Sequence, residues 1–168
     1  MHYQFPTITH IDQVLAAIEG EPSFKVKETE IDGHTFTVID YLLSTPEVFP
    51  EVTDVNSALR RECRGIMFRS DGTVASRPYH KFFNLGERDD TSRDVVDLSK
   101  KHVILDKLDG SMIRPVMVGS DFRLCTKAGV TDVSQQAEQW LRNLVWPESV
   151  AYMDFIYNCL HNNATPIS

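Results

Sequence analysis

The residues with the clearest chemical potential are the five from Lys107 to Ser111, which read Lys-Leu-Asp-Gly-Ser. A lysine amine is a nucleophile only when it is neutral, and nearby cations or partial desolvation increase its neutral fraction. The chain offers three such cations, Arg64, Lys81 and Lys127, which would also attract phosphate groups. The pattern therefore indicates a covalent nucleotide-transfer site with Lys107 as its nucleophile. The alternative is an ordinary Asp-Gly turn beside a solvated lysine.

The segments on both sides of this motif are predicted to be strands. Residues 102–106 are apolar and β-branched, and residues 112–118 are apolar again. Asp-Gly is a strong signal for a tight turn between two strands. We therefore expect Lys107 at the tip between two strands, with its amine directed into a cleft.

Hairpins and helices occur in separate blocks along the chain, which predicts an α+β fold. We expect a helix capped by Thr9 that runs to Ile18, a loop marked by Pro46 and Pro50, and an exposed connector over residues 86–93. The remaining expected strands are 24–31, 34–42, 64–69, 73–79 and 122–127, with turns at Asp32-Gly33, Asp71-Gly72 and 119–121. A later helix is expected at 132–145, with Asp132 and Gln135 as its cap. Another is expected to start at Pro147 and to end at Asn162-Asn163, before a strand entry at 164–168. The residues expected on one face of this last helix are Val150, Met153, Ile156, Tyr157 and Leu160.

The charge distribution matters more than the total. A chain of 168 residues with 42% apolar content forms one globular domain, and its net charge of −7 argues at first against a nucleic-acid partner. However, 14 of the 17 lysines and arginines lie between residues 60 and 127, where they outnumber the acidic residues. This segment can supply the positive potential that phosphate binding needs. The alternative is that these cations lie on solvated strand edges.

The three cysteines are an odd number without a Cys-x-x-Cys pair or a histidine at metal-ligand spacing. We expect Cys63, Cys125 and Cys159 to be reduced and mostly buried, and we expect no metal-ligating residues. No apolar run has the length of a membrane span, and residues 1–6 lack the pattern of a signal peptide. The expected location is cytoplasmic, without a membrane partner.

Four stretches around the lysine motif carry a family resemblance. They are Glu-Cys-Arg-Gly-Ile-Met-Phe at 62–68, Ala-Ser-Arg-Pro at 75–78, Lys-Phe-Phe-Asn-Leu at 81–85 and Thr-Lys-Ala-Gly at 126–129. In this order and spacing the chain resembles the ATP-dependent phage RNA ligases of the RNA ligase 1 (tRNA-repair) family. The resemblance covers roughly residues 58–145, whereas residues 1–57 match only loosely, as a helix and a hairpin.

The resemblance implies a nucleotidyltransferase fold of the ligase and capping-enzyme type, which is unrelated to ATP-grasp. We expect a single domain over residues 1–168, with a helix and hairpin subregion in 1–57 and the nucleotide-binding core and helices in 58–168. The family's later acidic and lysine motifs have no counterpart here. We therefore expect the N-terminal part of a longer enzyme, incomplete at its C-terminus, rather than a natural short form. Alone it would lack part of the adenine pocket and the metal-binding carboxylates, and we expect it to be inactive.

The implied reaction begins when the Lys107 amine attacks the α-phosphorus of ATP, giving lysyl-AMP and pyrophosphate. AMP then moves to an RNA 5′-phosphate, and a 3′-hydroxyl displaces it to seal the strand. The implied cofactors are ATP and Mg²⁺, which bridges phosphate oxygens. The implied partner is RNA with 5′-phosphate and 3′-hydroxyl ends, including cleaved tRNA, in the host cytoplasm if the protein is phage-encoded.

The resemblance also assigns roles to individual residues. Arg64 would contact the ribose and help to set the RNA end, while Lys81 and Lys127 would hold the β- and γ-phosphates. Phe83 would pack beneath the site, and Gly110 would permit close backbone approach. Asp109 would orient the turn or the terminal hydroxyl. The complete set of implied nucleotide-binding residues is Arg64, Lys81, Phe83, Asp106, Gly110 and Lys127.

Two alternative functions stay open. A DNA ligase or an RNA-capping guanylyltransferase shares Lys-x-Asp-Gly, but neither is expected to carry Ala-Ser-Arg-Pro-x-x-Lys-Phe-Phe-Asn-Leu. A non-catalytic module that binds nucleotides or RNA ends could keep the fold without the reaction. The intact Lys107 argues against this second alternative, whereas the missing motifs argue for it.

Overall fold

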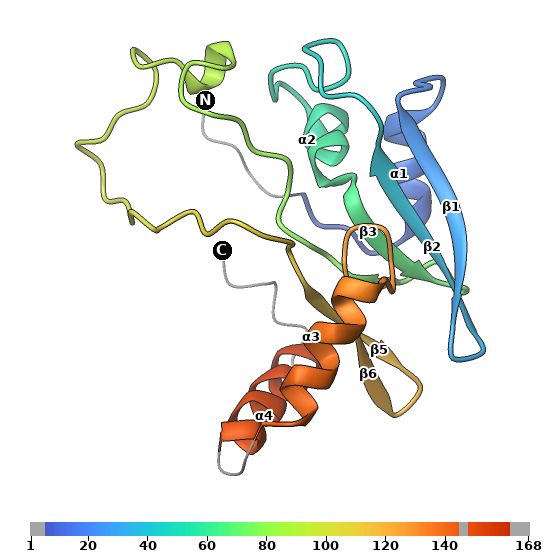
Figure 1. Cartoon of the computed structure of the whole chain (residues 1–168). Helices are drawn as coiled ribbons and strands as arrows, with labels where there is room; N and C mark the ends of the chain where they lie inside the picture. The colour runs from blue at the N-terminus through green and yellow to red at the C-terminus, as the bar shows by residue number, and fades with distance from the viewer. Residues whose placement is uncertain (1–5, 145–147, 162–168) are drawn as a thin grey trace.

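The computed structural model describes residues 6–144 and 148–161 (Figure 1). Its helices are α1 (Ile11–Ile18), α2 (Val55–Glu62), the 3₁₀ turn η1 (Asp89–Thr91), α3 (Asp132–Arg142) and α4 (Glu148–His161). Its strands are β1 (Phe24–Ile31), β2 (His34–Tyr41), β3 (Arg64–Arg69), β4 (Val74–Ser76), β5 (Arg114–Val118) and β6 (Asp121–Cys125). The described chain is a small α+β protein, as the separate blocks of hairpins and helices predict.

The strands form two antiparallel sheets. The larger sheet has the order β1-β2-β3-β4, and the smaller one is the β5–β6 ribbon. The predicted hairpin of β1 and β2 is confirmed, with Ile31 opposite His34 across a two-residue turn. Asp32 and Gly33 have φ angles of 49° and 79°, the paired positive values of a type I′ turn. Local turn chemistry therefore fixes the register of this hairpin.

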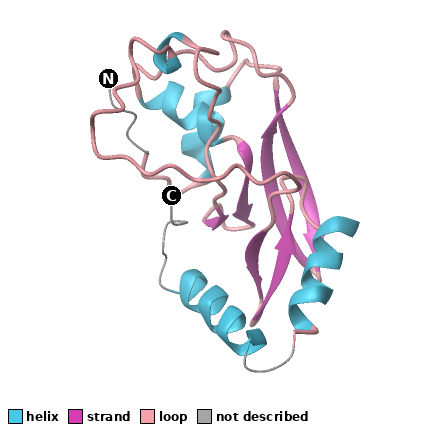
Figure 2. Cartoon of the chain, turned by 60° about the vertical axis from the view of Figure 1, so that its left-hand side comes forward, coloured by secondary structure: helices cyan, strands magenta, loops and turns pink. Residues whose placement is uncertain are grey.

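Core residues pack on both faces of the four-stranded sheet. On one face α1 and α2 pack over Phe24, Ile39 and Ile66, and the cluster includes the fully buried Phe49 and Phe68. On the other face the β5–β6 ribbon packs, so that Val116 and Cys125 join Phe36, Val38 and Met67. The order of layers is helices, large sheet, ribbon (Figures 1 and 2). The residues of β3 are therefore packed from both sides, Ile66 and Phe68 by one cluster and Met67 by the other.

The last two helices cover the outer face of the ribbon. Phe122 and Leu124 of β6 pack with Leu141 of α3, and Met153 and Ile156 of α4 lie against the same cluster. The predicted apolar face of α4 is thus confirmed for Met153 and Ile156, whereas Val150 is 41% exposed. The predicted contributions of Tyr157 and Leu160, and the elements expected at 162–168, lie outside the described side chains.

The predicted caps of two helices are wrong by one residue. His10, not Thr9, is the N-cap of α1, because its Nδ1 accepts from the Asp12 amide at 3.3 Å. Thr131, not Asp132, caps α3, and its amide donates to the Ser134 hydroxyl at 2.9 Å. Short polar side chains next to each other compete for one cap, and the sequence does not rank them.

Two predicted strands also need correction, and one helix was missed. The strand predicted at 73–79 is only Val74–Ser76, and the strand predicted to begin at 112 begins at Arg114. The loop predicted around Pro46 and Pro50 is followed by α2, which was not predicted. Asp54 starts this helix by accepting from the Ser57 amide at 2.7 Å.

The strand predicted at 102–106 is absent. This segment belongs to an irregular arc that leads away from the sheets after Gly86, and Val103, Ile104 and Leu105 are 78%, 86% and 78% exposed (Figure 1). A strand forms only where a neighbouring strand satisfies its backbone groups, and no described strand lies beside this one. No described helix is long and apolar enough to cross a membrane.

Candidate functional site

A pocket of about 210 Å³ lies where the lysine motif meets the sheet. It is lined by Arg64 at the start of β3, Ser111 and Met112 from the motif segment, and Thr126 and Lys127 after β6. Three of the sequence stretches that predict the site therefore meet in space. More than 40 residues separate Arg64 from Ser111, and more than 10 separate Met112 from Thr126. Two cations and two hydroxyl groups at one pocket can bind an anion such as phosphate.

Lys127 lies at the tip of a tight turn. β6 ends at Cys125, so the strand predicted to reach Lys127 is two residues shorter. The Thr126 amide donates to the Gly129 carbonyl at 2.9 Å, and the Gly129 amide donates back at 3.1 Å. The Lys127 ammonium lies 2.9 Å from Asp40 Oδ2 and 5.0 Å from the centre of the Tyr41 ring. The turn and these two β2 residues fix the position of the lysine.

Lys81 belongs to the same group of cations. Its Nζ lies 5.8 Å from the centre of the Tyr41 ring, the ring that Lys127 also approaches, and 4.4 Å from the centre of the Phe83 ring. Phe83 packs edge-on against the buried Phe49, with ring centres 6.1 Å apart. Phe83 thus packs between Lys81 and the buried core.

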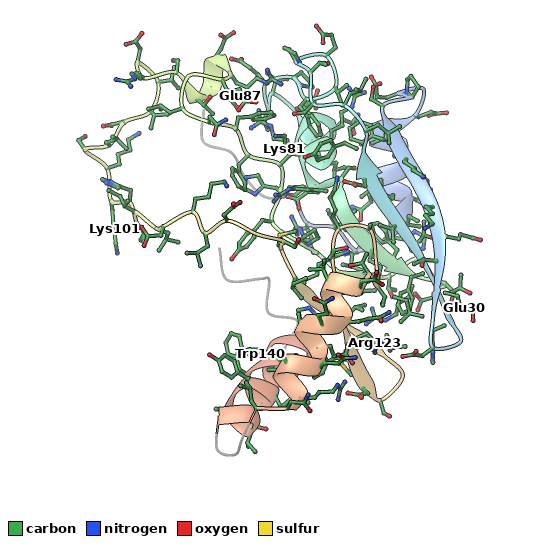
Figure 3. All side chains as sticks on the ribbon, in the orientation of Figure 1. Glu30, Lys81, Glu87, Lys101, Arg123 and Trp140 are labelled. Atoms are coloured by element: carbon green, nitrogen blue, oxygen red, sulfur yellow. The ribbon has the colours of Figure 1, made fainter. Side chains whose placement is uncertain are left out.

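The surroundings of Lys81 favour binding of an anion. Partial burial lowers the pKa of Lys81 and the nearby Arg64, Arg88 and Arg61 lower it further, whereas Glu87 opposes them. The guanidinium groups of Arg88 and Arg61 also lie over the Phe83 ring, at 4.5 Å and 5.0 Å. Figure 3 shows Lys81 beside α2, with Glu87 on the adjoining loop. Cations placed this close repel one another, and a bound anion would relieve the repulsion.

Gly65 allows the backbone of Lys127 to approach β3. The β2–β3 register shifts between Ile39 and Asp40, because Asp40 pairs with Arg64 and leaves Gly65 as the extra residue. Gly65 has a φ of 84°, and a Cβ built on it would lie 2.7 Å from the Lys127 carbonyl oxygen. Backbone conformation and space therefore both require glycine at this bulge, which lies next to the pocket residue Arg64.

Other residues of the matched stretches hold the site together. Glu62 is almost fully buried and pairs with Arg77 at 2.9 Å, which ties the start of β3 to the segment after β4. Arg114 is buried at the base of β5, where it donates to the Gly65 carbonyl and, at 3.4 Å, to the Ser76 hydroxyl. Burial lowers the pKa of Arg114 to about 10, while Cys125 and Asp40 raise it. These pairs explain why charged residues occur inside the apolar core.

Lys107 lies outside this group. It belongs to the irregular exposed segment 101–111, and its side chain makes no hydrogen bond, ion pair or ring contact with another described residue. The predicted tip between two strands is therefore wrong, since only the strand that follows the motif is formed. Ser111, four residues later, reaches the pocket, so the motif enters the site by its C-terminal end.

The other two predicted residues of this segment are also exposed. Asp106 is exposed, and Gly110 has a φ of 128° with nothing within 4 Å of the position that a Cβ would occupy. The conformation of Gly110 requires glycine, but no part of the described chain approaches it. Asp109 accepts the Gly110 amide at 3.0 Å, which is a local turn contact.

The described residues contain no group of three or more histidine, cysteine or acidic side chains that could hold a metal ion. Cys63 and Cys125 are buried free thiols. Burial raises the pKa of Cys125 to about 11 and raises that of Cys63 further. Neither thiol is a nucleophile in this environment, and the side chain of Cys159 is outside the described part.

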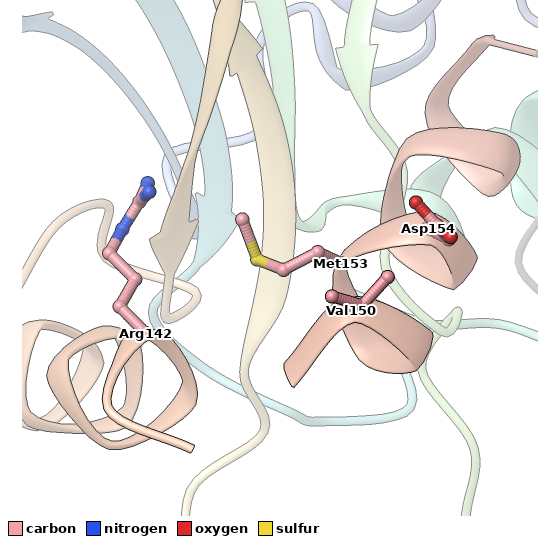
Figure 4. A pocket seen from close by; sticks show the side chains of 4 residues that line it. All are labelled: Arg142, Val150, Met153 and Asp154. Atoms are coloured by element: carbon pink, nitrogen blue, oxygen red, sulfur yellow. The ribbon is translucent and has the colours of Figure 1, made fainter. Parts of the chain in front are cut away.

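A larger cavity of about 400 Å³ lies between α3 and α4 and contains none of the matched stretches (Figure 4). Arg142, Val150, Met153 and Asp154 line it. Arg142 is already bound to Glu138 at 3.1 Å and to Asp121 at 3.2 Å. The lining of this cavity has one cation, which two carboxylates already bind, and the acidic Asp154, whereas the smaller pocket has two cations and no acidic lining residue, so this cavity is the poorer candidate for phosphate.

Sequence reasoning missed several residues that line the pocket or contact its cations. Asp40 and Tyr41 lie far from the lysine motif in sequence and carry no local signal. Gly65 had a signal, because a glycine between Arg64 and an apolar strand indicates a bulge or a close approach. Ser111 and Thr126 are members of the stretches that resemble the family, but they had no assigned role.

Comparison with known proteins gives a family match that covers the pocket. The family described as RNA ligase matches residues 62–168, which include every residue of the pocket. The chain is 36% identical over 135 residues to a Thermovibrio ammonificans protein named "Putative RNA ligase", covering 79% of this chain and 32% of that protein. It is 34% identical over 101 residues to RNA ligase 1 of bacteriophage TS2126, covering 57% of this chain and 24% of that protein.

The match over most of the chain places it in a family of nucleic-acid-joining enzymes. The protein belongs to the RNA ligase 1 family. The chain spans about a third or less of the length of these two relatives.

Proposed function

We propose that this protein is an ATP-dependent RNA ligase in which Lys107 forms a covalent lysyl-AMP. One observation carries the proposal: Ser111 of the Lys-x-Asp-Gly-Ser motif lines the same pocket as Arg64 and Lys127. Family membership names the reaction class, and the pocket offers the cations that a triphosphate needs. The alternative of an ordinary turn beside a solvated lysine does not explain why three distant stretches meet there.

The proposed reaction has three steps. The neutral Lys107 amine attacks the α-phosphorus of ATP, a P–N bond forms, and the bond to pyrophosphate breaks while the amine loses a proton. The RNA 5′-phosphate oxygen then attacks the same phosphorus, which breaks the P–N bond and restores the lysine. Finally the 3′-hydroxyl attacks the activated 5′-phosphate, a phosphodiester forms, and AMP leaves.

The cations of the pocket would act on the phosphates and not on the lysine directly. Lys81 and Lys127 approach the Tyr41 ring from positions 46 residues apart in sequence, which suits them to bind neighbouring phosphates. Arg64 would contact the nucleotide and the RNA end at the mouth of the pocket. Positive charge at these positions stabilises the leaving pyrophosphate. Lys107 would reach the α-phosphorus from the motif segment, whose end at Ser111 is held at the pocket.

The remaining parts of the proposal follow from the family. The substrates are ATP and RNA with 5′-phosphate and 3′-hydroxyl ends, such as cleaved tRNA. Mg²⁺ would accompany the ATP phosphates. Asp106 and Gly110 would contact the nucleotide once the exposed segment is ordered around it. The chain would form the N-terminal portion of an adenylyltransferase domain, with residues 1–57 as its helix and hairpin subregion.

A labelling experiment tests the nucleophile. The complete gene product is incubated with [α-³²P]ATP or [α-³²P]GTP and Mg²⁺, and covalent label is measured after denaturation. We expect labelling by ATP and not GTP, and we expect Lys107→Ala and Lys107→Arg to abolish it, because neither residue offers a neutral amine. Lys101→Ala is the matched control, since Lys101 lies on the same exposed arc (Figure 3).

The other outcomes identify the alternatives. Labelling by GTP would indicate a capping guanylyltransferase, and joining of DNA in preference to RNA would indicate a DNA ligase. Binding of ATP without covalent label would favour a non-catalytic module. Acid-labile label that persists in both Lys107 variants would contradict the assignment of the nucleophile.

A further inference from the structure

Asp40 is the acidic residue that contacts the cationic pocket, and none of the matched stretches includes it. Its Oδ2 lies 2.9 Å from the Lys127 ammonium, and 87 residues of sequence separate the two. The Asp40 side chain is only 22% exposed, whereas that of Lys127 is 51% exposed. The carboxylate is thus the fixed partner, and the lysine is the one held in place.

The backbone around Asp40 is arranged for this contact. Asp40 is paired with Arg64 at the register shift of β2 and β3, directly beside the Gly65 bulge. That bulge brings the Lys127 backbone within 3 Å of the position that a Gly65 side chain would occupy. The acidic side chain and the main chain of the lysine therefore converge at one irregular point of the sheet.

The second carboxylate oxygen of Asp40 has no hydrogen-bond partner in the described part of the chain, unlike that of an ordinary surface salt bridge, which water can reach. Asp40 Oδ1 is buried and accepts no hydrogen bond from any described residue. The charge of Asp40 also raises the pKa of the buried Arg114, so its field reaches the interior of the site. A half-buried carboxylate with an unused oxygen costs folding free energy. Its placement beside a candidate phosphate ligand argues for a role at the site.

We propose that Asp40 is a positioning residue that holds the Lys127 ammonium over the Tyr41 ring and directs it at the polyphosphate of the nucleotide. The inference rests on the proposed function, in which Lys127 binds phosphate. Lysine has three N–H donors and a flexible stem with high rotamer entropy. One N–H of Lys127 that donates to Asp40 fixes the side chain, and the other two N–H groups remain available to phosphate oxygens.

This role predicts a particular response to mutation. Asp40→Asn removes the charge but keeps the shape, and Asp40→Glu keeps the charge but moves the carboxylate. If Asp40 positions Lys127, both variants raise the ATP concentration for half-maximal adenylation by about tenfold, as expected for loss of one charge-assisted contact. If Asp40 only competes with the nucleotide for the lysine, Asp40→Asn lowers that concentration, which would overturn the inference.

A double-mutant cycle with Lys127→Ala tests whether Asp40 acts through the lysine. Asp40→Asn should have little further effect in the Lys127→Ala protein, because the partner is already gone. Independent effects, which multiply in the double variant, would overturn the inference. Asp32→Asn is the matched control. In the turn that precedes β2 it breaks a 2.7 Å ion pair to Arg123, and it should leave the adenylation constants unchanged.

The two proposals fail in different ways. Wild-type protein without covalent label would refute the proposed ligase activity. Wild-type labelling with independent Asp40 and Lys127 effects would refute only the role of Asp40. Calorimetric titration with inorganic tripolyphosphate repeats the cycle without any catalysis. We expect Asp40→Asn to bind tripolyphosphate about tenfold more weakly than the wild type, with no further loss in the Lys127→Ala background. Equal tripolyphosphate affinity of Asp40→Asn and wild type would overturn the inference.

Discussion

Gly65→Ala is expected to damage both the fold and the pocket. The residue has a φ of 84°, and this left-handed conformation costs an L-residue about 1–2 kcal/mol. The new Cβ would also lie 2.7 Å from the Lys127 oxygen, 2.8 Å from its Cα and 2.9 Å from its Cβ. Since two of these atoms are backbone, the turn that carries Lys127 must move. Overpacking of this kind reduces stability by a further amount of about 1–3 kcal/mol.

The free energy of unfolding should therefore fall by about 2–5 kcal/mol, a large part of the stability of a small domain. Displacement of Lys127 should reduce the rate of adenylation by on the order of 100-fold, as for a misplacement of about 1 Å. Urea denaturation measures the first quantity. Covalent labelling with ATP, under conditions where the variant is folded, measures the second.

Gly33→Ala is the control that separates strain from contact. Gly33 has a similar φ of 79°, but a Cβ there would meet nothing within 4 Å. This variant should lose only the conformational part, about 1–2 kcal/mol, and should label normally. If both variants lose the same stability and Gly65→Ala labels like the wild type, close approach of Lys127 to β3 is not important.

The remaining predictions concern the phosphate ligands and a structural carboxylate. Lys81→Ala and Lys127→Ala should impair adenylation of the protein more than sealing of RNA that already carries a 5′-adenylate, because these residues are proposed to bind phosphates that the second assay lacks; equal losses would indicate a structural role. Glu138→Gln should reduce stability at pH 7 by about 1–2 kcal/mol, because Glu138 accepts from the Leu124 amide at 3.0 Å and pairs with Arg123 and Arg142. Burial alone would raise the pKa of Glu138, but these partners lower it overall, so the stabilisation is present above the unfolded-state pKa and is lost as pH falls through the folded-state value. Urea midpoints of wild type and variant should therefore converge below about pH 4, and a constant difference across pH would contradict the assignment.

Local signals predicted much of the fold. The Asp32-Gly33 turn, the alternation in β1 and β2, and the spacing of Leu141 in α3 each depend on neighbours in sequence. By contrast, α2 has few apolar positions, and its buried Arg61 and Glu62 are neutralised by Asp90 and Arg77. Partners that lie 29 and 15 residues away cannot be identified from the pattern of one helix.

The candidate site was predictable to a similar extent. The cations were found from residue type and from the family resemblance, and Arg64 and Lys127 do line one pocket. The prediction of a strand before Lys107 was wrong, because β propensity indicates that a segment can form a strand but not that a partner strand lies beside it. Asp40 could not be found, since its importance depends on a bulge and on a turn 87 residues later.

The exposed segment before the lysine motif has a consequence for the solution behaviour of the protein. Val103, Ile104 and Leu105 form a short run with high β propensity and free backbone groups, which is the composition of an aggregation-prone segment. Lys101 and Lys107 flank this run, and such charges act as gatekeepers against self-association. Removal of Lys107 would delete a gatekeeper together with the proposed nucleophile. Lys107→Arg keeps the charge and removes only the amine, so it reports on chemistry without a change in colloidal stability.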